Sequence, residues 1–440
     1  MKKTILIALS IALSIALALT FTTCEEPHTH DYGTAWKTND TQHWHECSCG
    51  DKIDIANHDY DTDFVCTVCG YTHNHEYSAT WSSNAIQHWH ECTSNDGAKT
   101  DIANHTGNPC TVCGYDSLQN WTAVSNSTFG TATNGTSGIR SIAYGIADGA
   151  SVGRFVAVGI GGKMAYSANG ASWTGVSNST VWQYTASGST YTAHIYGIAY
   201  GIADGASVGR FVAGGRVGKM AYSANGTSWT AVSNSTFGTS WDDYINAIAY
   251  GNNRFVAGGS QGKMAYSTDN GVTWTAVSNS TFGTSSINAI AYGIADGESV
   301  GRFVAGGWNG KMAYSANGIT WTAVADSTFG SSYIRGIAYG NNRFVAVGDN
   351  GKMAYSANGA SWTAIADSTF GTSGIYGIAY GNGRFVAVGG AGNMAYSDDG
   401  ETWTRVSNST FGTTWINGIA YGNNRFVAVG DNGKMAYANW

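Results

Sequence analysis

The chain has 440 residues, enough for two or three domains. It holds 60 Gly and only 2 Pro, and charged residues make up 12%, about half of the usual share, which excludes a disordered chain and is not typical of a helical one. A net charge of -7 without a clustered basic face gives no electrostatic basis for binding nucleic acid or anionic lipid.

Residues 1–24 predict an export signal. Two lysines precede an apolar run from Ile5 to Leu19, which is followed by small and polar residues. Two cleavage positions remain open: after Ala18, or before Cys24, whose sulfur would then carry lipid as in bacterial lipoproteins. We expect an exported protein at the cell surface, outer membrane or periplasm, with any membrane contact made through a lipid anchor on Cys24.

Histidine and cysteine are concentrated in the next segment. Ten of the 11 His and seven of the eight Cys lie in two similar units, residues 25–72 and 73–115. Each unit ends in Cys-x-x-Cys-Gly, a turn that points two thiolates at one metal ion. We predict one structural zinc ion per unit, because such small units rarely hold together on a core alone. The predicted ligands are Cys47, His58, Cys66 and Cys69 in the first unit and Cys92, His105, Cys110 and Cys113 in the second.

Two alternatives stay open for these units. His45 and His90 are the nearest substitute ligands, and disulfides are reasonable in an exported protein. Without Cys24 an odd number of cysteines remains, and Cys49 has no counterpart in the second unit, which favours metal. The units resemble the zinc-ribbon-like His/Cys/Trp repeats of bacterial surface proteins, a resemblance that implies location more than activity.

From Trp121 onward one pattern recurs seven times. Each copy carries Ile-Ala-Tyr-Gly, Arg-Phe-Val-Ala, Lys-Met-Ala-Tyr-Ser (Asn replaces the Lys in one copy and Ala replaces the Ser in the last) and Trp-Thr runs, separated by Gly/Asn turns. Four short β-type runs in about 40 to 55 residues are typical of a propeller blade and not of a helical solenoid. We therefore predict an all-β fold: a seven-bladed β-propeller over residues 116–440, preceded by the two small modules.

The order of the runs predicts how the ring closes. The first Trp-Thr run begins at Trp121, and the chain ends at Trp440, where the same run of the seventh copy is due. Residues 121–124 should therefore complete the last blade, which leaves no unpaired sheet edge at the junction.

The turn before each Trp-Thr run resembles a known repeat. Ser267-Thr268-Asp269-Asn270-Gly271-Val272-Thr273-Trp274 resembles the Asp-box (BNR) repeat of sialidase-type propellers, and residues 397–403 form a shorter variant. Other copies keep the frame with Asn for Asp, and the resemblance extends to the photosystem II assembly-factor type of propeller. It implies a structural turn in which Asp accepts local N–H bonds, Gly takes a positive φ and Trp packs between sheets.

We do not expect an enzyme. A working sialidase would show an arginine triad on blade-specific loops, whereas this chain repeats one Arg at the same position of every copy, which indicates a scaffold role. Both prolines precede the propeller, so the family's Pro-containing arginine motif is absent. Isolated carboxylates such as Asp242 and Asp243 have no partner that the sequence places at glycosidase spacing. A glycoside-active enzyme stays the weakest alternative, and it would require two converging carboxylates near Asp242 or Asp349.

The copies differ mainly in two places, which should emerge on one face of the ring. One is the start of the first strand of each copy, and the other is the turn between its second and third strands. Variable aromatic, Arg, Asn and Asp side chains on a rigid frame are typical of a recognition surface, although drift of duplicated loops is the alternative. We expect a monomer that binds a glycan or a protein ligand, with a scaffold or assembly factor as the alternative. The predicted ligand-binding residues are Arg140, His194, Tyr196, Arg216, Tyr244, Trp308, Tyr333, Arg335, Asp349, Tyr376, Trp415 and Asp431.

Overall fold

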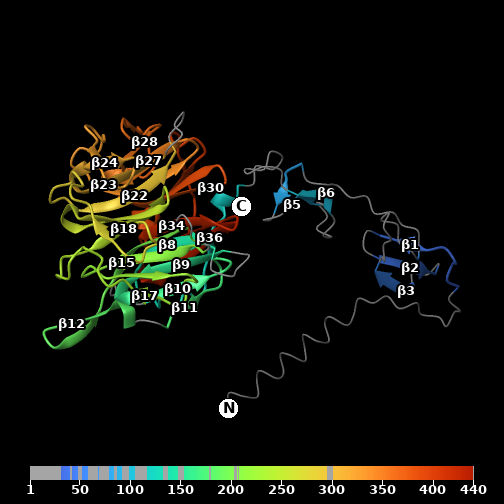
Figure 1. Ribbon diagram of the computed structural model, residues 1–440. Coiled ribbons are helices and arrows are strands. Elements are labelled where there is room, and N and C mark those ends of the chain that lie inside the picture. The colour runs from blue at the N-terminus through green and yellow to red at the C-terminus, as the bar shows by residue number, and fades with distance from the viewer. Residues whose placement is uncertain are drawn as a thin grey trace, which may run out of the picture. The chain divides into compact units, whose positions relative to one another are not determined.

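The computed structural model divides the chain into two units, Met1–Asn104 and His105–Trp440. It describes residues 31–39, 42–47, 52–57, 68, 79–83, 87–91, 99–104, 116–131, 137–146, 153–177, 180–202, 206, 208–294 and 301–439. Across these ranges the regular structure consists of β-strands and single 3₁₀ turns (Figure 1). None of the described helices has the length and apolar character needed to cross a membrane.

The first unit contains two small antiparallel sheets of the same design. One is formed by β1 (Lys37–Thr38), β2 (Gln42–Glu46) and β3 (Lys52–Asn57), the other by β4 (Ser82–Ser83), β5 (Gln87–Glu91) and β6 (Lys99–Asn104). A histidine stacks on a tryptophan in each, with ring centroids 3.9 Å apart for Trp36 and His45 and for Trp81 and His90. The sequence duplication is therefore also a duplication of structure.

The second unit contains seven four-stranded antiparallel sheets within its described residues, numbered here as sheets 1 to 7 (Figure 1). The first strands of the sheets are β8 (Ile139–Gly145), β14 (Ile195–Gly201), β18 (Ile245–Gly251), β22 (Ile287–Gly293), β26 (Ile334–Gly340), β30 (Ile375–Gly381) and β34 (Ile416–Gly422). The second strands are β9 (Arg154–Gly159), β15 (Arg210–Gly215), β19 (Arg254–Gly259), β23 (Arg302–Gly307), β27 (Arg343–Gly348), β31 (Arg384–Gly389) and β35 (Arg425–Gly430).

The two outer strands of each sheet are shorter. The third strands are β10 (Met164–Ser167), β16 (Met220–Ser223), β20 (Met264–Ser267), β24 (Met312–Ser315), β28 (Met353–Ser356), β32 (Met394–Ser397) and β36 (Met435–Asn439). The fourth strands are β11 (Thr174–Gly175), β17 (Thr230–Ala231), β21 (Thr275–Ala276), β25 (Thr322–Ala323), β29 (Thr363–Ala364), β33 (Thr404–Arg405) and, for sheet 7, β7 (Thr122–Ala123). A hairpin of β12 (Gln183–Ala186) and β13 (Ser189–Thr192) is inserted between sheets 1 and 2.

The seven first strands contact one another in a closed ring, in which β34 contacts β8. The second strands supply the core between neighbouring sheets, because successive side chains of a strand point to opposite faces. On β27, Phe344 and Ala346 pack toward sheet 4, whereas Val345 and Val347 pack toward sheet 6. All four are fully buried, and burial of one such phenylalanine contributes about 1.5–3 kcal/mol.

The ring closes with the first strand of this unit. On sheet 7, β7 pairs antiparallel with β36, with Thr122 opposite Tyr437 and Ala123 opposite Ala436. The Val124 N–H also donates to the Met435 carbonyl at 2.9 Å, as the equivalent Val176 donates to Met164 on sheet 1. The predicted completion of the last sheet by residues 121–124 is therefore confirmed.

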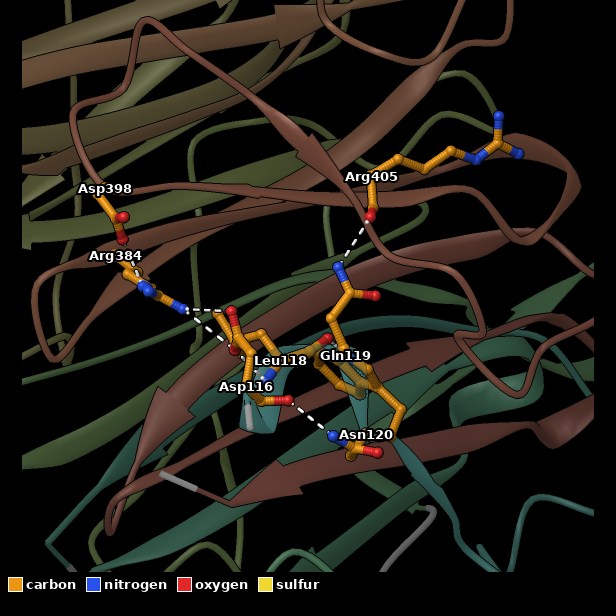
Figure 2. A network of polar contacts seen from close by, with 8 residues as sticks. Asp116, Leu118, Gln119, Asn120, Arg384, Asp398 and Arg405 are labelled. Atoms are coloured by element: carbon orange, nitrogen blue, oxygen red, sulfur yellow. Dashed lines mark hydrogen bonds and ion pairs between the residues drawn. The ribbon is translucent and has the colours of Figure 1, made fainter. Parts of the chain in front are cut away.

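Residues 116–121, which precede β7, stabilise this closure (Figure 2). Around the 3₁₀ turn η1 (Ser117–Gln119), Asp116 accepts from Nη1 of Arg384 at 3.0 and 3.1 Å. Arg384 also pairs with Asp398, and Gln119 donates to the Arg405 carbonyl at 3.0 Å. Both members of the Asp116–Arg384 pair are buried. Residues 116–121 therefore occupy the place that a continuous turn fills in the other sheets.

Candidate functional site

The first strand of every sheet carries a β-bulge at the same position. Pairing with the second strand is regular from the third residue onward, and the register shifts between the first and third residues in all seven sheets. A bulged residue has no cross-strand partner, and a bulge re-aims its side chain. The bulged residues are Arg140, Tyr196, Asn246, Asn288, Arg335, Tyr376 and Asn417.

These seven bulge residues line one cavity at the centre of the ring. With Trp415 they surround a space of about 370 Å³, which we call the mouth. A narrower space of about 180 Å³ is lined by the same seven residues and by small and Ile residues of the same strands. The mouth falls within the range of roughly 300–1,000 Å³ typical of small-ligand sites. Variation in the sequence is thus concentrated where the seven sheets converge.

The second variable set lies next to the first, as predicted. The first residue after each second strand donates its backbone N–H to the carbonyl of the residue just before the first strand, at 2.9 to 3.0 Å. On sheet 5, for example, Asp349 donates to Tyr333. Because this bond recurs in every sheet, the two sets of loops form one continuous rim around the mouth.

Two arginines of the mouth are held by aspartates of the rim. Arg335 binds Asp349 through two bonds, Nε to Oδ1 at 2.9 Å and Nη2 to Oδ2 at 3.0 Å. Arg140 of sheet 1 reaches Asp431 of sheet 7 at 3.1 Å. Each pair is about one-third exposed, so the charges balance while their remaining donors and acceptors stay accessible to a ligand.

The asparagines of the mouth bridge neighbouring sheets. Asn246 and Asn288 each donate from Nδ2 to a backbone carbonyl of the next sheet, at 3.1 and 3.2 Å. Asn417 donates in the same way to Ile139 at 2.9 Å and also to Asp431. The Oδ1 atoms of these three residues make no hydrogen bond to any described residue, so they are available as acceptors. Sequence reasoning left them out of the predicted set, although they occupy the same repeat position as Arg140 and Tyr196.

Aromatic pairs flank the mouth on the rim. Trp308 and Tyr333 stack with ring centroids 5.1 Å apart and an interplanar angle of 6°. Tyr376 and Trp415 lie 5.4 Å apart at 46°. Both tryptophans are substantially exposed, 41% for Trp308 and 52% for Trp415. Large exposed aromatic surfaces of this kind mark interaction sites.

A third group surrounds His194. Its Nδ1 accepts the backbone N–H of Gly161 at 2.9 Å, so the ring is the neutral tautomer. Burial lowers the pKa of His194, and the positive charges of Arg216 and Arg140 lower it further. Burial also raises the pKa of Tyr196, the nearby Tyr244 raises it further, and the two arginines oppose the change. In this part of the rim, His194 is therefore neutral and Arg216 carries a positive charge.

The structure separates the twelve predicted residues into two groups. Arg140, Tyr196, Arg335, Tyr376 and Trp415 line the mouth. The other seven lie on the rim, and Tyr333, Asp349 and Tyr376 also line a shallow space of about 450 Å³ between sheets 5 and 6. Sequence reasoning missed Tyr184, Tyr191 and Trp241, which lie beside this rim. The signal that marks two of them is the inserted hairpin, which breaks the repeat spacing between sheets 1 and 2.

The repeated arginines have the scaffold geometry that their spacing predicted. Each stacks over the tyrosine of the third strand in its own sheet, with Cζ 4.4 to 5.9 Å from the ring centroid. Several also bind the following sheet, as Arg254 does by donating to the Asn317 carbonyl at 2.6 Å. These guanidiniums connect sheets and do not converge on one site.

The turns between the third and fourth strands have the hydrogen-bonded geometry that the resemblance implied. Asp269 accepts from Val272 and Thr273, Gly271 has φ 85°, and the Trp274 ring N–H donates to the Gly271 carbonyl. Burial alone would raise the pKa of Asp399, but hydrogen bonds from Thr402, Glu401 and Ser397 lower it to about 2. In copies with Asn, such as Asn358, the side-chain oxygen accepts the same two backbone bonds. The turn is structural in both forms.

One of the eight predicted metal ligands, Cys47, lies among the described residues. Cys47 is disulfide-bonded in the structure, so its sulfur is not a thiolate ligand, and the prediction for this residue is corrected in favour of the disulfide alternative. The other seven predicted ligands and Cys24 lie outside the described residues. Among the residues that are described, no group of three or more His, Cys, Asp or Glu side chains is arranged to hold a metal ion.

Comparison with known proteins places the fold. No family model and no curated protein sequence matches the chain. Solved propeller structures do: YCF48 bound to a D1 peptide, at 16% identity and a TM-score of 0.51, covers 73% of this chain and 95% of its own. YCF48 from Cyanidioschyzon merolae matches at 18% and 0.52, covering 72% of this chain and 98% of its own. An inactive virginiamycin B lyase from Staphylococcus aureus with quinupristin matches at 12% and 0.52, covering 73% and 99%. The all-β propeller class is confirmed.

Proposed function

We propose that this protein is an exported binding protein whose seven sheets act as the blades of one propeller and whose mouth recognises a segment of another protein. The observation that carries the proposal is the convergence of seven bulged, chemically varied side chains on one cavity. A ring of identical repeats has no structural need for different residues at this one position. The two arginines of the mouth are each paired with an aspartate of the rim, an arrangement that agrees with recognition of a ligand by hydrogen bonds.

The chemistry of the mouth suits a peptide. Two guanidiniums supply N–H donors, three asparagine oxygens supply acceptors, and two tyrosines with Trp415 supply apolar surface. A peptide backbone presents N–H and C=O groups in equal numbers, so it requires both kinds of partner. A YCF48 propeller has been solved with a D1 peptide, which agrees with this use of the fold. A glycan ligand in the same mouth is the second candidate, favoured by the exposed Trp415 ring.

The surroundings of the propeller are part of the proposal. We infer an export signal over residues 1–24, a lipid anchor on Cys24 and a monomeric chain, with the modules 25–72 and 73–115 as a stalk. One structural zinc ion per module stays a prediction. The Cys47 disulfide supports the alternative for the first module, and metal analysis combined with thiol titration of the purified chain separates the two.

The test is selection of peptides from a displayed library against the mature chain, with affinities measured by calorimetry. Replacing Arg335, Tyr376 and Trp415 together by Ala should weaken binding by at least about tenfold, because one lost contact of 1.4 kcal/mol has that effect. The matched control is Ile319→Ala, an exposed residue in the turn between the third and fourth strands of sheet 4. Selected peptides that bind the triple variant as tightly as the parent would contradict the proposal.

A further inference from the structure

The hairpin between sheets 1 and 2 is the described element that departs most from the repeat, and β12 stands out from the ring (Figure 1). Its strands pair in register from Gln183 opposite Thr192 to Ala186 opposite Ser189. The two-residue turn has positive φ at both Ser187 and Gly188, which matches the twist of a tight hairpin. The insertion is therefore a regular β-hairpin and not an irregular loop.

The base of the hairpin is fixed in the core. Trp182 is fully buried and packs against Gly162, as Phe329 packs against Gly310 three sheets further on. The Ala193 N–H donates to the Trp182 carbonyl at 2.9 Å, which closes the base. Trp182 therefore takes the place of the repeat phenylalanine, and the insertion is added without loss of the core.

The hairpin carries a row of aromatic rings toward the next connection of the ring. Tyr184 and Tyr191 lie directly opposite each other and stack, with centroids 5.6 Å apart and an interplanar angle of 28°. Tyr184 in turn lies 6.4 Å from Trp241, which precedes sheet 3. Tyr191 is 45% exposed and Trp241 is 54% exposed. We call these three residues the aromatic platform.

Arg216 holds the platform in place. Its guanidinium carbon lies 3.2 Å from the centroid of the Trp241 ring, and Nε donates to the Trp241 carbonyl. A cation over one face of an indole ring fixes the orientation of that ring. Trp241 nevertheless keeps more than half of its surface exposed. The largest exposed aromatic residue of the platform is thus pre-positioned before any ligand arrives.

The polar character of the platform identifies the class of ligand. Residues 183–192 contain no charged side chain, and Arg216, which lies over Trp241, and Asp242, which follows Trp241 in the chain, have opposite signs. A polyanion such as a nucleic acid would require a basic surface. The hydroxyls of Tyr184 and Tyr191 and the indole N–H of Trp241 make no hydrogen bond to described residues. Flat rings edged by neutral donors and acceptors match a pyranose, whose C–H face is apolar and whose rim is hydroxylated.

We infer that the aromatic platform is a second recognition site, separate from the mouth, for a neutral oligosaccharide. None of its three rings lines the mouth. A row of rings contributed by two successive connections suits a linear chain in which consecutive sugars stack on successive rings. The inference does not depend on the peptide proposal, because the two sites share no residue.

The experiment is calorimetric titration of the full mature chain with neutral hexasaccharides of glucose, mannose and xylose. Comparison ligands are the hexamer of galacturonic acid, a hexadeoxythymidine and decaproline, which test charge and ring stacking separately. We expect one of the neutral hexasaccharides to bind and the comparison ligands to bind at least about tenfold more weakly. Trp241→Ala should weaken hexasaccharide binding by about tenfold or more, since one ring stack contributes up to roughly that factor.

Control variants separate this site from the mouth and from misfolding. Tyr191→Phe keeps the ring and removes one hydroxyl, so its loss should be smaller than that of Tyr191→Ala. The triple variant of Arg335, Tyr376 and Trp415 should keep hexasaccharide binding even if it loses peptides. Unchanged urea midpoints confirm that the exposed variants fold. The inference is overturned if no neutral hexasaccharide binds at millimolar concentration, if Trp241→Ala and Tyr191→Ala bind normally, or if a comparison ligand binds more tightly.

Discussion

The two ends of each sheet differ in how much their residues vary from one copy of the repeat to the next. At the end that carries the turn between the third and fourth strands, Ser, Asp or Asn, Gly and Trp recur in the same hydrogen-bonded frame. At the other end, the bulge carries Arg, Tyr or Asn, and the rim residues differ between most sheets. The first end keeps one set of bonds in every sheet, whereas the bonds made at the bulge change with the residue: the asparagines donate to the next sheet and the arginines pair with rim aspartates. A repeat fold can therefore vary at one face because the opposite face does not.

The largest effect is expected for Asp116→Ala. Asp116 lies in the segment that replaces, in sheet 7, the continuous turn between the third and fourth strands of the other sheets. Loss of this carboxylate removes the buried partner of Arg384, whereas Asp398 is largely exposed, and breaking a buried pair costs about 3 kcal/mol. Urea unfolding of the chain measures the change. The matched control is Glu401→Ala on Arg343, a pair that is 42% and 25% exposed and should lose about 1 kcal/mol or less. Equal losses in the two variants would contradict a special role for the closure.

A smaller effect is expected in the turns between the third and fourth strands. Asp399→Ala removes acceptors for two backbone N–H groups and should cost about 1–2 kcal/mol at pH 7. Asp399→Asn should cost much less, because Asn358 makes the same bonds. The folded pKa of Asp399 is about 2, below its ordinary value of 3.8. Its ionised form therefore stabilises the fold above pH 3.8, and that contribution is lost as the pH falls from 3.8 through 2. Acid unfolding of the Asn variant should lack this component.

On the variable face, His194 should give a weaker pH dependence. Its folded pKa is below the ordinary 6.5, so the unfolded chain takes up the proton first as the pH falls. Protonation also removes the acceptor for Gly161. Stability should decline as the pH drops below about 6.5 in the parent and less so in His194→Asn. Urea midpoints at pH 7.5 and 5.5 in both proteins measure the difference, and parallel shifts would refute the assignment.

The smallest effect on stability is expected at the bulges. Asn288→Arg gives sheet 4 the residue that sheets 1 and 5 carry at this position, and should change the unfolding free energy by about 1 kcal/mol or less, the contribution of the Asn288 bond to the Ile334 carbonyl. At the start of the second strand of the same sheet, Arg302→Asn makes the opposite change. It removes the guanidinium that stacks over Tyr314 and should be clearly more destabilising than Asn288→Arg. Thermal melts of the two variants compare the two faces within one sheet.

The propeller was predictable from the sequence because its information is local and repeated. Recurrent β-branched and aromatic runs specify strands, Gly and Asn specify turns, and the position of Trp121 specifies the closure. The two variable sets could be placed together because strand direction alone determines which loops share an end. Asn246, Asn288 and Asn417 were not selected, since only the bulge shows that every residue at this position points into the mouth.

Other features depend on contacts that no spacing reveals. The pairing of Asp116 with Arg384 joins residues far apart in the chain, and Arg384 looks in sequence like every other repeated arginine. The aromatic platform combines two tyrosines of the inserted hairpin with Trp241 from the connection before sheet 3. The disulfide of Cys47 reverses an expectation that rested on residue counts. The sequence patterns therefore predicted which face of the ring varies. The contacts of individual side chains could be identified only from the structure.

The pairing of β7 with β36 also sets the timing of assembly. Ala123 is among the first propeller residues to be made, and its partner Ala436 is among the last. Six sheets are complete in contiguous stretches of chain and can form as they emerge, whereas the seventh waits for the final residues. A chain halted before Met435 therefore keeps two open sheet edges, so the ring can close only after β36 has been made.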